Sequence, residues 1–73
     1  MKQHFFRVSA NHVSKTYSFV RERVRVDEDA KGFAATHPAL GYGKTFSTPE
    51  AAIRHLLEDH ACTDIRIEPE RRA

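Results

Sequence analysis

Five histidines and one cysteine are the side chains of this 73-residue sequence that could bind a metal ion or activate a nucleophile. His60 and Cys62 lie two residues apart, so they could supply two metal ligands or form a nucleophile–base pair. Further ligands could come from His4, His12 or His37. No ligand spacing or catalytic triad accompanies them, so we expect no catalytic residue, metal or cofactor, although whether His60 and Cys62 bind a metal stays open.

Residues 41–45, Gly-Tyr-Gly-Lys-Thr, end like a phosphate-binding loop. Such a loop requires a glycine five positions before its last glycine, where this sequence has Pro38, and a long helix directly after it. We therefore expect a bend over residues 38–43, with a short strand resuming at Lys44. No enzymatic activity and no small-molecule substrate are expected.

Alternating aromatic and arginine side chains form the strongest candidate for a binding surface. Residues two apart in a strand point to the same face. Tyrosine and arginine are common anchors of protein interfaces, while aromatic rings and guanidinium groups also suit single-stranded RNA. The pattern predicts a module that binds a partner protein or a second copy of the chain through an open sheet face or an edge strand. Nucleic acid is the alternative partner, unless the pattern only solubilises a half-exposed sheet. Its members are Tyr17, Phe19, Arg21, Arg23 and Arg25.

Short aromatic and β-branched segments predict strands, and one segment with apolar residues at helical spacing predicts a helix. Ile53, Leu56 and Leu57 would form the buried stripe of this helix. Thr48 suits its N-cap and Pro49 its first position. The expected strands are 2–10, 17–26, 33–37, 44–46 and 64–68, and the helix is expected to end near residue 60 or 61.

The element order β-β-β-(β)-α-β predicts an α+β fold, a two-layer sandwich with one helix on one face of a mainly antiparallel sheet of four or five strands. We expect one domain over residues 1–68 and a charged tail over residues 69–73. Because a helix precedes it, the last strand is expected to lie parallel to a neighbour. Residues 27–32 predict a hairpin connection in which Gly32 can take a positive φ.

The two faces of the second strand differ in character. Val20, Val24 and Val26 would meet the helix, with the aromatic and arginine residues on the other face. Glu22 interrupts the valines, so the period is imperfect. A bulge in this strand would exchange the two faces.

Charge is uneven along the chain, whose net charge is +2. Residues 1–25 hold six basic groups and one acidic group, whereas residues 26–73 hold six basic and nine acidic groups. Such asymmetry can steer a polyanion toward one surface. A single cysteine excludes an internal disulfide, and neither a leader peptide nor an apolar run of membrane-spanning length is recognised, so we expect a cytoplasmic protein with no membrane partner.

Four local motifs follow one another between Val24 and Leu57. They are an acidic turn, a strand that opens with glycine and an aromatic residue, a Pro-x-Leu-Gly bend and a Thr-x-Glu-Ala helix start. They stand here as Asp27-Glu28-Asp29, Gly32-Phe33, Pro38-Ala39-Leu40-Gly41 and Thr48-Pro49-Glu50-Ala51. In this order they resemble the HicB-like antitoxin domain. The resemblance implies a small inhibitory domain that binds a protein and can form dimers.

Overall fold

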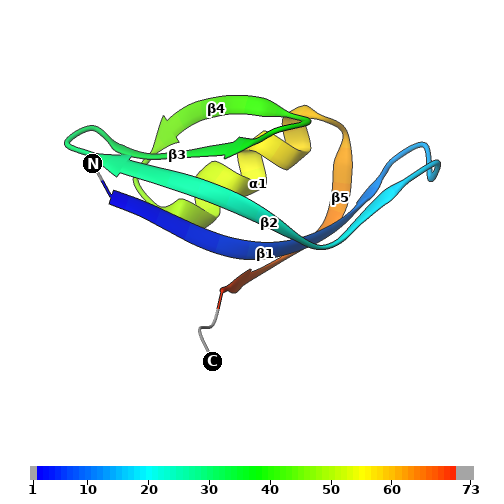
Figure 1. The fold of residues 1–73 in the computed structure, drawn as a ribbon. Helices are drawn as coiled ribbons and strands as arrows, with labels where there is room; N and C mark the ends of the chain where they lie inside the picture. The colour runs from blue at the N-terminus through cyan, green and yellow to red at the C-terminus, as the bar shows by residue number, and fades with distance from the viewer. Residues whose placement is uncertain (1, 71–73) are drawn as a thin grey trace.

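The computed structural model describes residues 2–70, which form one five-stranded antiparallel sheet with a single helix packed on one face (Figure 1). This confirms the predicted α+β two-layer sandwich. The strand order across the sheet is β4-β3-β2-β1-β5. The elements are β1 (Lys2–His12), β2 (Ser18–Asp29), β3 (Gly32–His37), β4 (Gly41–Phe46), α1 (Pro49–Asp59) and β5 (Cys62–Pro69).

The last strand is antiparallel to its only neighbour. β5 pairs with β1 in the antiparallel direction, so the prediction of a parallel neighbour was wrong. Because every adjacent pair is antiparallel, β4 and β5 point in the same direction, but they lie at opposite edges of the sheet. α1 therefore connects one edge to the other, and it contacts β3, β4 and β5 along this path.

The helix begins where the sequence predicts. The Thr48 hydroxyl accepts a hydrogen bond from the Ala51 N–H at 3.1 Å, and Pro49 occupies the first turn. This cap satisfies one of the N–H groups that a helix start leaves without a partner. Ile53 and Leu57 are buried against the sheet, as their spacing predicts.

The core lies between α1 and the sheet and combines large helix side chains with small strand side chains. The sheet contributes valines and alanines, which allow the helix to lie close to the strands. The predicted contact of Val24 and Val26 with this core is confirmed. Its buried members are Val8, Ala10, Val24, Val26, Ala35, Ala52, Ile53, Leu56, Leu57 and Cys62.

A bulge at the start of β2 exchanges the two faces of that strand. Opposite the stretch between Val8 and Ala10 of β1, β2 has one residue more than β1. Arg21 lies at this irregularity with a φ of 49°. As a result Phe19 packs against the core and Val20 is 75% exposed, the reverse of the predicted sides.

Some strand boundaries also differ from those predicted. The bend expected over residues 38–43 is confined to residues 38–40, because β4 begins at Gly41 and not at Lys44. Pro69 belongs to β5, and Glu70 contacts the sheet, which differs from the tail predicted over residues 69–73. Residues 71–73 lie outside the described part. The hairpin connection predicted over residues 27–32 is shorter, because β2 runs to Asp29 and β3 begins at Gly32. Gly32 has a positive φ of +134°, as predicted.

Residues 2–70 include no helix of sufficient length and apolarity to cross a membrane.

Candidate binding surface

The three arginines of the predicted surface lie on the sheet face opposite α1, which we call the open face. Arg23 and Arg25 alternate with Val24 and Val26, which are buried toward the helix, so their side chains point to the open face. Arg21 lies at the bulge and is exposed. The structure therefore brings the arginines of β2 together.

Tyr17 and Phe19 do not belong to the open face, contrary to the prediction. The ring of Phe19 lies 5.6 Å from that of His37 between centroids, on the helix side. Tyr17 precedes β2 and stacks on His12 at 4.6 Å, while its edge meets Phe19 at 5.8 Å. The bulge at Arg21 is the physical reason, because it turns the residues before it to the other side. The aromatic and cationic halves of the predicted surface are thus separated by the sheet.

Phe19→Ala should lower the free energy of unfolding by about 1–2 kcal/mol, because the ring packs against the core. Val20→Ala is the matched control and should change stability by less than about 0.5 kcal/mol, because this side chain is 75% exposed. Urea denaturation followed by circular dichroism measures both. A larger loss for Val20→Ala would restore the side assignment predicted from the sequence.

Phe5 and Arg7 of β1 join the open face, a contribution that sequence analysis missed. In the antiparallel register Phe5 is opposite Arg25 and Arg7 is opposite Arg23. The Arg23 guanidinium carbon lies 3.9 Å from the centroid of the Phe5 ring, within the range of a cation–π interaction. The sequence does carry a signal for Phe5 and Arg7, because they lie two residues apart in a predicted strand and so share one of its faces.

Glu70 brings a carboxylate to the open face. It follows β5, whose C-terminal end emerges on the side of the sheet away from α1 (Figure 1). Its Oε2 lies 3.2 Å from Nε of Arg7 and 3.1 Å from Nε of Arg23. Its backbone N–H donates to the Phe5 carbonyl at 3.1 Å. One carboxylate therefore bridges two arginines from neighbouring strands.

Arg25 is held by two neighbours at the other end of the open face. Its Nε lies 3.1 Å from Oδ1 of Asp27, and its Nη2 donates to the Tyr42 hydroxyl at 3.0 Å. Tyr42, which comes from the edge strand β4, is 71% exposed. A hollow of 260 Å³ lies beside this group and is lined by Phe5, Arg23, Arg25, Thr36 and Pro38.

Ion pairs neutralise most of the positive charge on the open face. Arg21 Nη1 lies 3.3 Å from Oε2 of Glu68, which adds a further pair to those of Glu70 and Asp27. Four guanidinium groups and three carboxylates take part, so these paired groups together keep one positive charge. The electrostatic attraction for a polyanion is therefore weaker than the basic first third of the sequence indicates.

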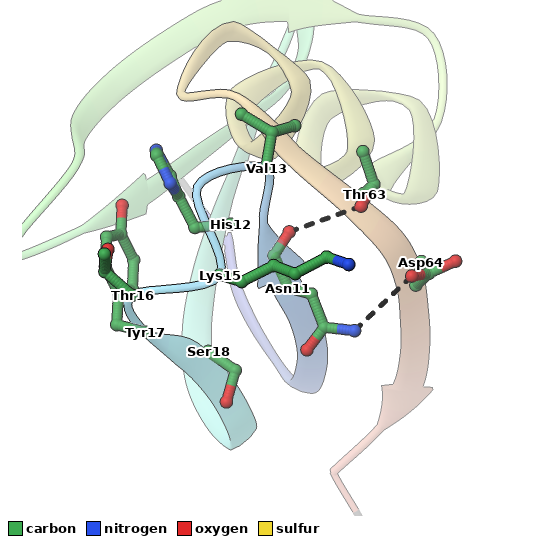
Figure 2. Close-up of a pocket in the computed structure, with 9 residues that line it drawn as sticks. All are labelled: Asn11, His12, Val13, Lys15, Thr16, Tyr17, Ser18, Thr63 and Asp64. Atoms are coloured by element: carbon green, nitrogen blue, oxygen red, sulfur yellow. Dashed lines mark hydrogen bonds between the residues drawn. The ribbon is translucent and has the colours of Figure 1, made fainter.

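A polar pocket lies at the tip of the β1–β2 hairpin, where the chain approaches the start of β5 (Figure 2). Asn11 Nδ2 donates to Asp64 Oδ2 at 3.4 Å, and the Thr63 hydroxyl donates to the Asn11 carbonyl at 3.5 Å. Lys15, with a φ of 60°, extends its side chain toward the β5 side of the pocket. These contacts join the hairpin to β5.

Glu22, which interrupts the valines of β2, pairs with a buried histidine. Nε2 of His37 lies 3.1 Å from Oε1 of Glu22, and the ring is 8% exposed. Nδ1 of His37 accepts a hydrogen bond from the Ala39 N–H at 3.1 Å. Since Nδ1 accepts this hydrogen bond, Nε2 carries the ring proton, and Nε2–H donates a hydrogen bond to the Glu22 carboxylate. The Glu22–His37 pair lies at the margin of the core and explains why a glutamate interrupts the alternating valines of β2.

Cys62 and the five histidines are the side chains whose types suggest metal binding or nucleophile chemistry. Between residues 2 and 70, no group of three or more His, Cys, Asp or Glu side chains could hold a metal ion. The Cys62 thiol is buried and donates to the His60 carbonyl, with 3.7 Å between sulfur and oxygen. It contacts the backbone of His60 and so gains no general base from that hydrogen bond.

Burial raises the pKa of the Cys62 thiol above its ordinary value of 9.0. We expect the folded chain to react with a disulfide reagent at pH 7.5 at least about tenfold more slowly than the chain in urea, because thiolate and access are both reduced. Equal rates would contradict the burial.

The stability linked to the protonated thiol is present below pH 9.0 and is lost as the pH rises through the raised pKa.

Comparisons with protein-family models, with curated proteins and with solved structures found no match to this chain.

Proposed function

We propose that this chain is a small non-enzymatic interaction module that binds a partner protein through the open face of its sheet. The observation that supports this most directly is a hollow of 260 Å³ whose lining includes Phe5, Arg23 and Arg25. The Arg23 guanidinium lies over the Phe5 ring, and Arg25 donates to the hydroxyl of the exposed Tyr42. Aromatic and arginine side chains are enriched among the residues that dominate binding energy at protein interfaces.

Arg23 and Arg25 are held in place before any partner binds. The Phe5 ring lies beneath Arg23, and the Tyr42 hydroxyl and Asp27 carboxylate fix Arg25. A side chain that is already ordered loses less conformational entropy on binding. The open face therefore combines suitable residue types with preorganisation.

Nucleic-acid binding remains the second candidate function, and two observations favour protein over it. Phe19 and Tyr17 lie on the other side of the sheet from the arginines. Every arginine of β2 lies within 3.3 Å of a carboxylate oxygen. A single-stranded nucleic-acid site needs exposed rings beside unpaired cations on one face.

The resemblance of residues 24–57 to the HicB-like antitoxin domain supports a more specific version of the proposal. In that version the partner is a protein that this chain inhibits. The matching stretch runs from the second half of β2 into α1 and includes Arg25 and Tyr42. A second copy of the chain is the other partner in this class.

Sedimentation equilibrium at millimolar concentration tests the second copy first, and a strict monomer would remove the homodimer. A partner captured by the tagged chain is then titrated into ¹⁵N-labelled protein. We expect the shifted amides to surround Phe5, Arg23 and Tyr42. Arg23→Ala should weaken binding by about tenfold or more, whereas Arg54→Ala, which removes an equal charge from the exposed side of α1, should not.

Shifts confined to α1, or equal losses for the two variants, would reject the open face as the binding surface. A further arm adds a mixed-sequence single-stranded oligonucleotide at low salt. Binding that falls steeply with salt and is weakened by Arg23→Ala would favour nucleic acid instead.

A further inference from the structure

The carboxylate of Glu70 occupies a site made by two arginines without forming an aligned hydrogen bond there. Its Oε2 lies 3.2 Å from Nε of Arg7 and 3.1 Å from Nε of Arg23. Within residues 2–70, however, no donor is oriented to hydrogen-bond this buried oxygen. A buried carboxylate oxygen that lacks an aligned donor is poorly satisfied. Glu70 is therefore held by charge and by its backbone N–H, not by the fork geometry that guanidinium groups offer.

The two guanidinium groups are ordered but still accessible. Nη1 of Arg7 donates to the Arg21 carbonyl at 3.2 Å, which fixes its plane. Arg23 is fixed by the Phe5 ring. The side chains of Arg7 and Arg23 nevertheless remain 40% and 52% exposed. Each can therefore offer donors to a group that arrives from solvent.

Space for such a group lies next to the arginines. A hollow of 740 Å³ opens on the same face, with Glu70 as part of its wall. A guanidinium binds a carboxylate best through two parallel N–H groups. An acidic side chain entering this hollow meets Arg7 directly. Arg23 does not line the hollow, but its Nε lies 3.1 Å from the carboxylate of Glu70, which does, so displacement of Glu70 gives access to both arginines. The hollow is lined by Arg7, Arg21, Glu68, Pro69 and Glu70.

We propose that Arg7 and Arg23 form a binding site for an aspartate or glutamate side chain of the partner protein, and that Glu70 occupies this site in the free chain. This inference rests on the proposed function. The occupant is a carboxylate because a carboxylate already lies there. A nucleic-acid base is disfavoured because Arg23 covers the Phe5 ring on which it would stack. The partner displaces Glu70, so the free chain attenuates its own affinity.

Glu70→Gln in the full chain tests the site, with a blocked hexaglutamate peptide as the probe. We expect the peptide to bind this variant about three- to tenfold more tightly than the original chain, because no internal carboxylate competes. In ¹⁵N spectra the Nε–H signals of Arg7 and Arg23 should move on peptide addition. The Nε–H signal of Arg54, on the exposed side of α1, should stay in place.

Glu58→Gln is the matched control, since it makes the same charge change on the exposed side of the helix. An equal gain of affinity in both variants would show an effect of net charge and would overturn the site. Adding Arg7→Ala and Arg23→Ala to Glu70→Gln should abolish the gain, and a gain that survives would also overturn it. Tighter binding of oligouridylate than of the peptide to Glu70→Gln would assign the site to nucleic acid and overturn the proposal.

Two different outcomes distinguish rejection of the carboxylate site from rejection of the proposed function. If the peptide shows no preference for Glu70→Gln, while a captured partner still shifts the amides around Phe5 and Tyr42, only the carboxylate site is rejected. If the partner shifts no residue of the open face, the proposed function itself is rejected.

Discussion

Ile53→Ala is expected to lower the free energy of unfolding by about 3–4 kcal/mol, the largest effect that we expect from a single side chain of the core. Ile53 is fully buried at the centre of α1. The strand side of the same core includes Ala10 and Ala35, whose side chains are too small to fill a cavity left by the lost methyl and methylene groups. A chain of 73 residues has a total stability of roughly 4–11 kcal/mol, so this loss would leave a marginal fold.

Urea denaturation followed by circular dichroism measures this change, with Arg54→Ala as the matched control on the exposed side of the same helix. The control should change stability by less than about 0.5 kcal/mol. Arginine and alanine have similar helix propensities, so the comparison isolates burial. A loss for Ile53→Ala no larger than for the control would contradict the packing of α1 on the sheet.

Local rules were sufficient to predict most of the fold. Thr48 and Pro49 mark the start of α1 because capping depends on residues adjacent in sequence. Ile53 and Leu57 face the sheet because helical spacing is also local. The element order then leaves few arrangements for one helix and one sheet. The direction of β5 was not predictable in this way, since its partner β1 lies at the other end of the sequence.

The residues of the open face were predicted only in part, because the bulge at Arg21 decides which side chains of β2 lie on that face. Strand alternation placed Arg23 and Arg25 together, and this holds after Arg21. Before Arg21 the additional residue reverses the alternation and carries Phe19 to the core. No glycine marks this bulge, so its position depends on how β1 and β2 pair. Sequence alone could only indicate, through Glu22, that the period was imperfect.

The ion pairs of the open face were also beyond sequence reasoning. Glu70 meets Arg7 and Arg23 although it lies more than forty residues from both in the chain. Such contacts depend on the register of β5 against β1. They matter for function, because they convert an arginine-rich strand into a surface with little excess charge. Specific protein contacts then become a better explanation of the arginines than attraction to a polyanion.

Gly32→Ala is expected to destabilise the fold by about 3 kcal/mol, because two independent costs combine at this position. Gly32 has a φ of +134°, a conformation that residues with a side chain rarely adopt. A Cβ built there would collide with the Phe46 carbonyl oxygen of β4 and would lie 3.1 Å from Cγ2 of Thr45. These are backbone and strand neighbours, so relief requires β4 to move away from β3.

Gly41→Ala separates the two costs, because Gly41 also has a positive φ, +79°, but a Cβ there meets nothing within 4 Å. Only the conformational cost applies, so we expect a loss of about 1 kcal/mol. Thermal and urea unfolding of the two variants give the difference, which measures how closely β4 approaches the β2–β3 turn. Equal losses would mean that the Phe46 carbonyl does not press on Gly32. The edge strand that presents Tyr42 to the open face would then be held less closely than the structure indicates.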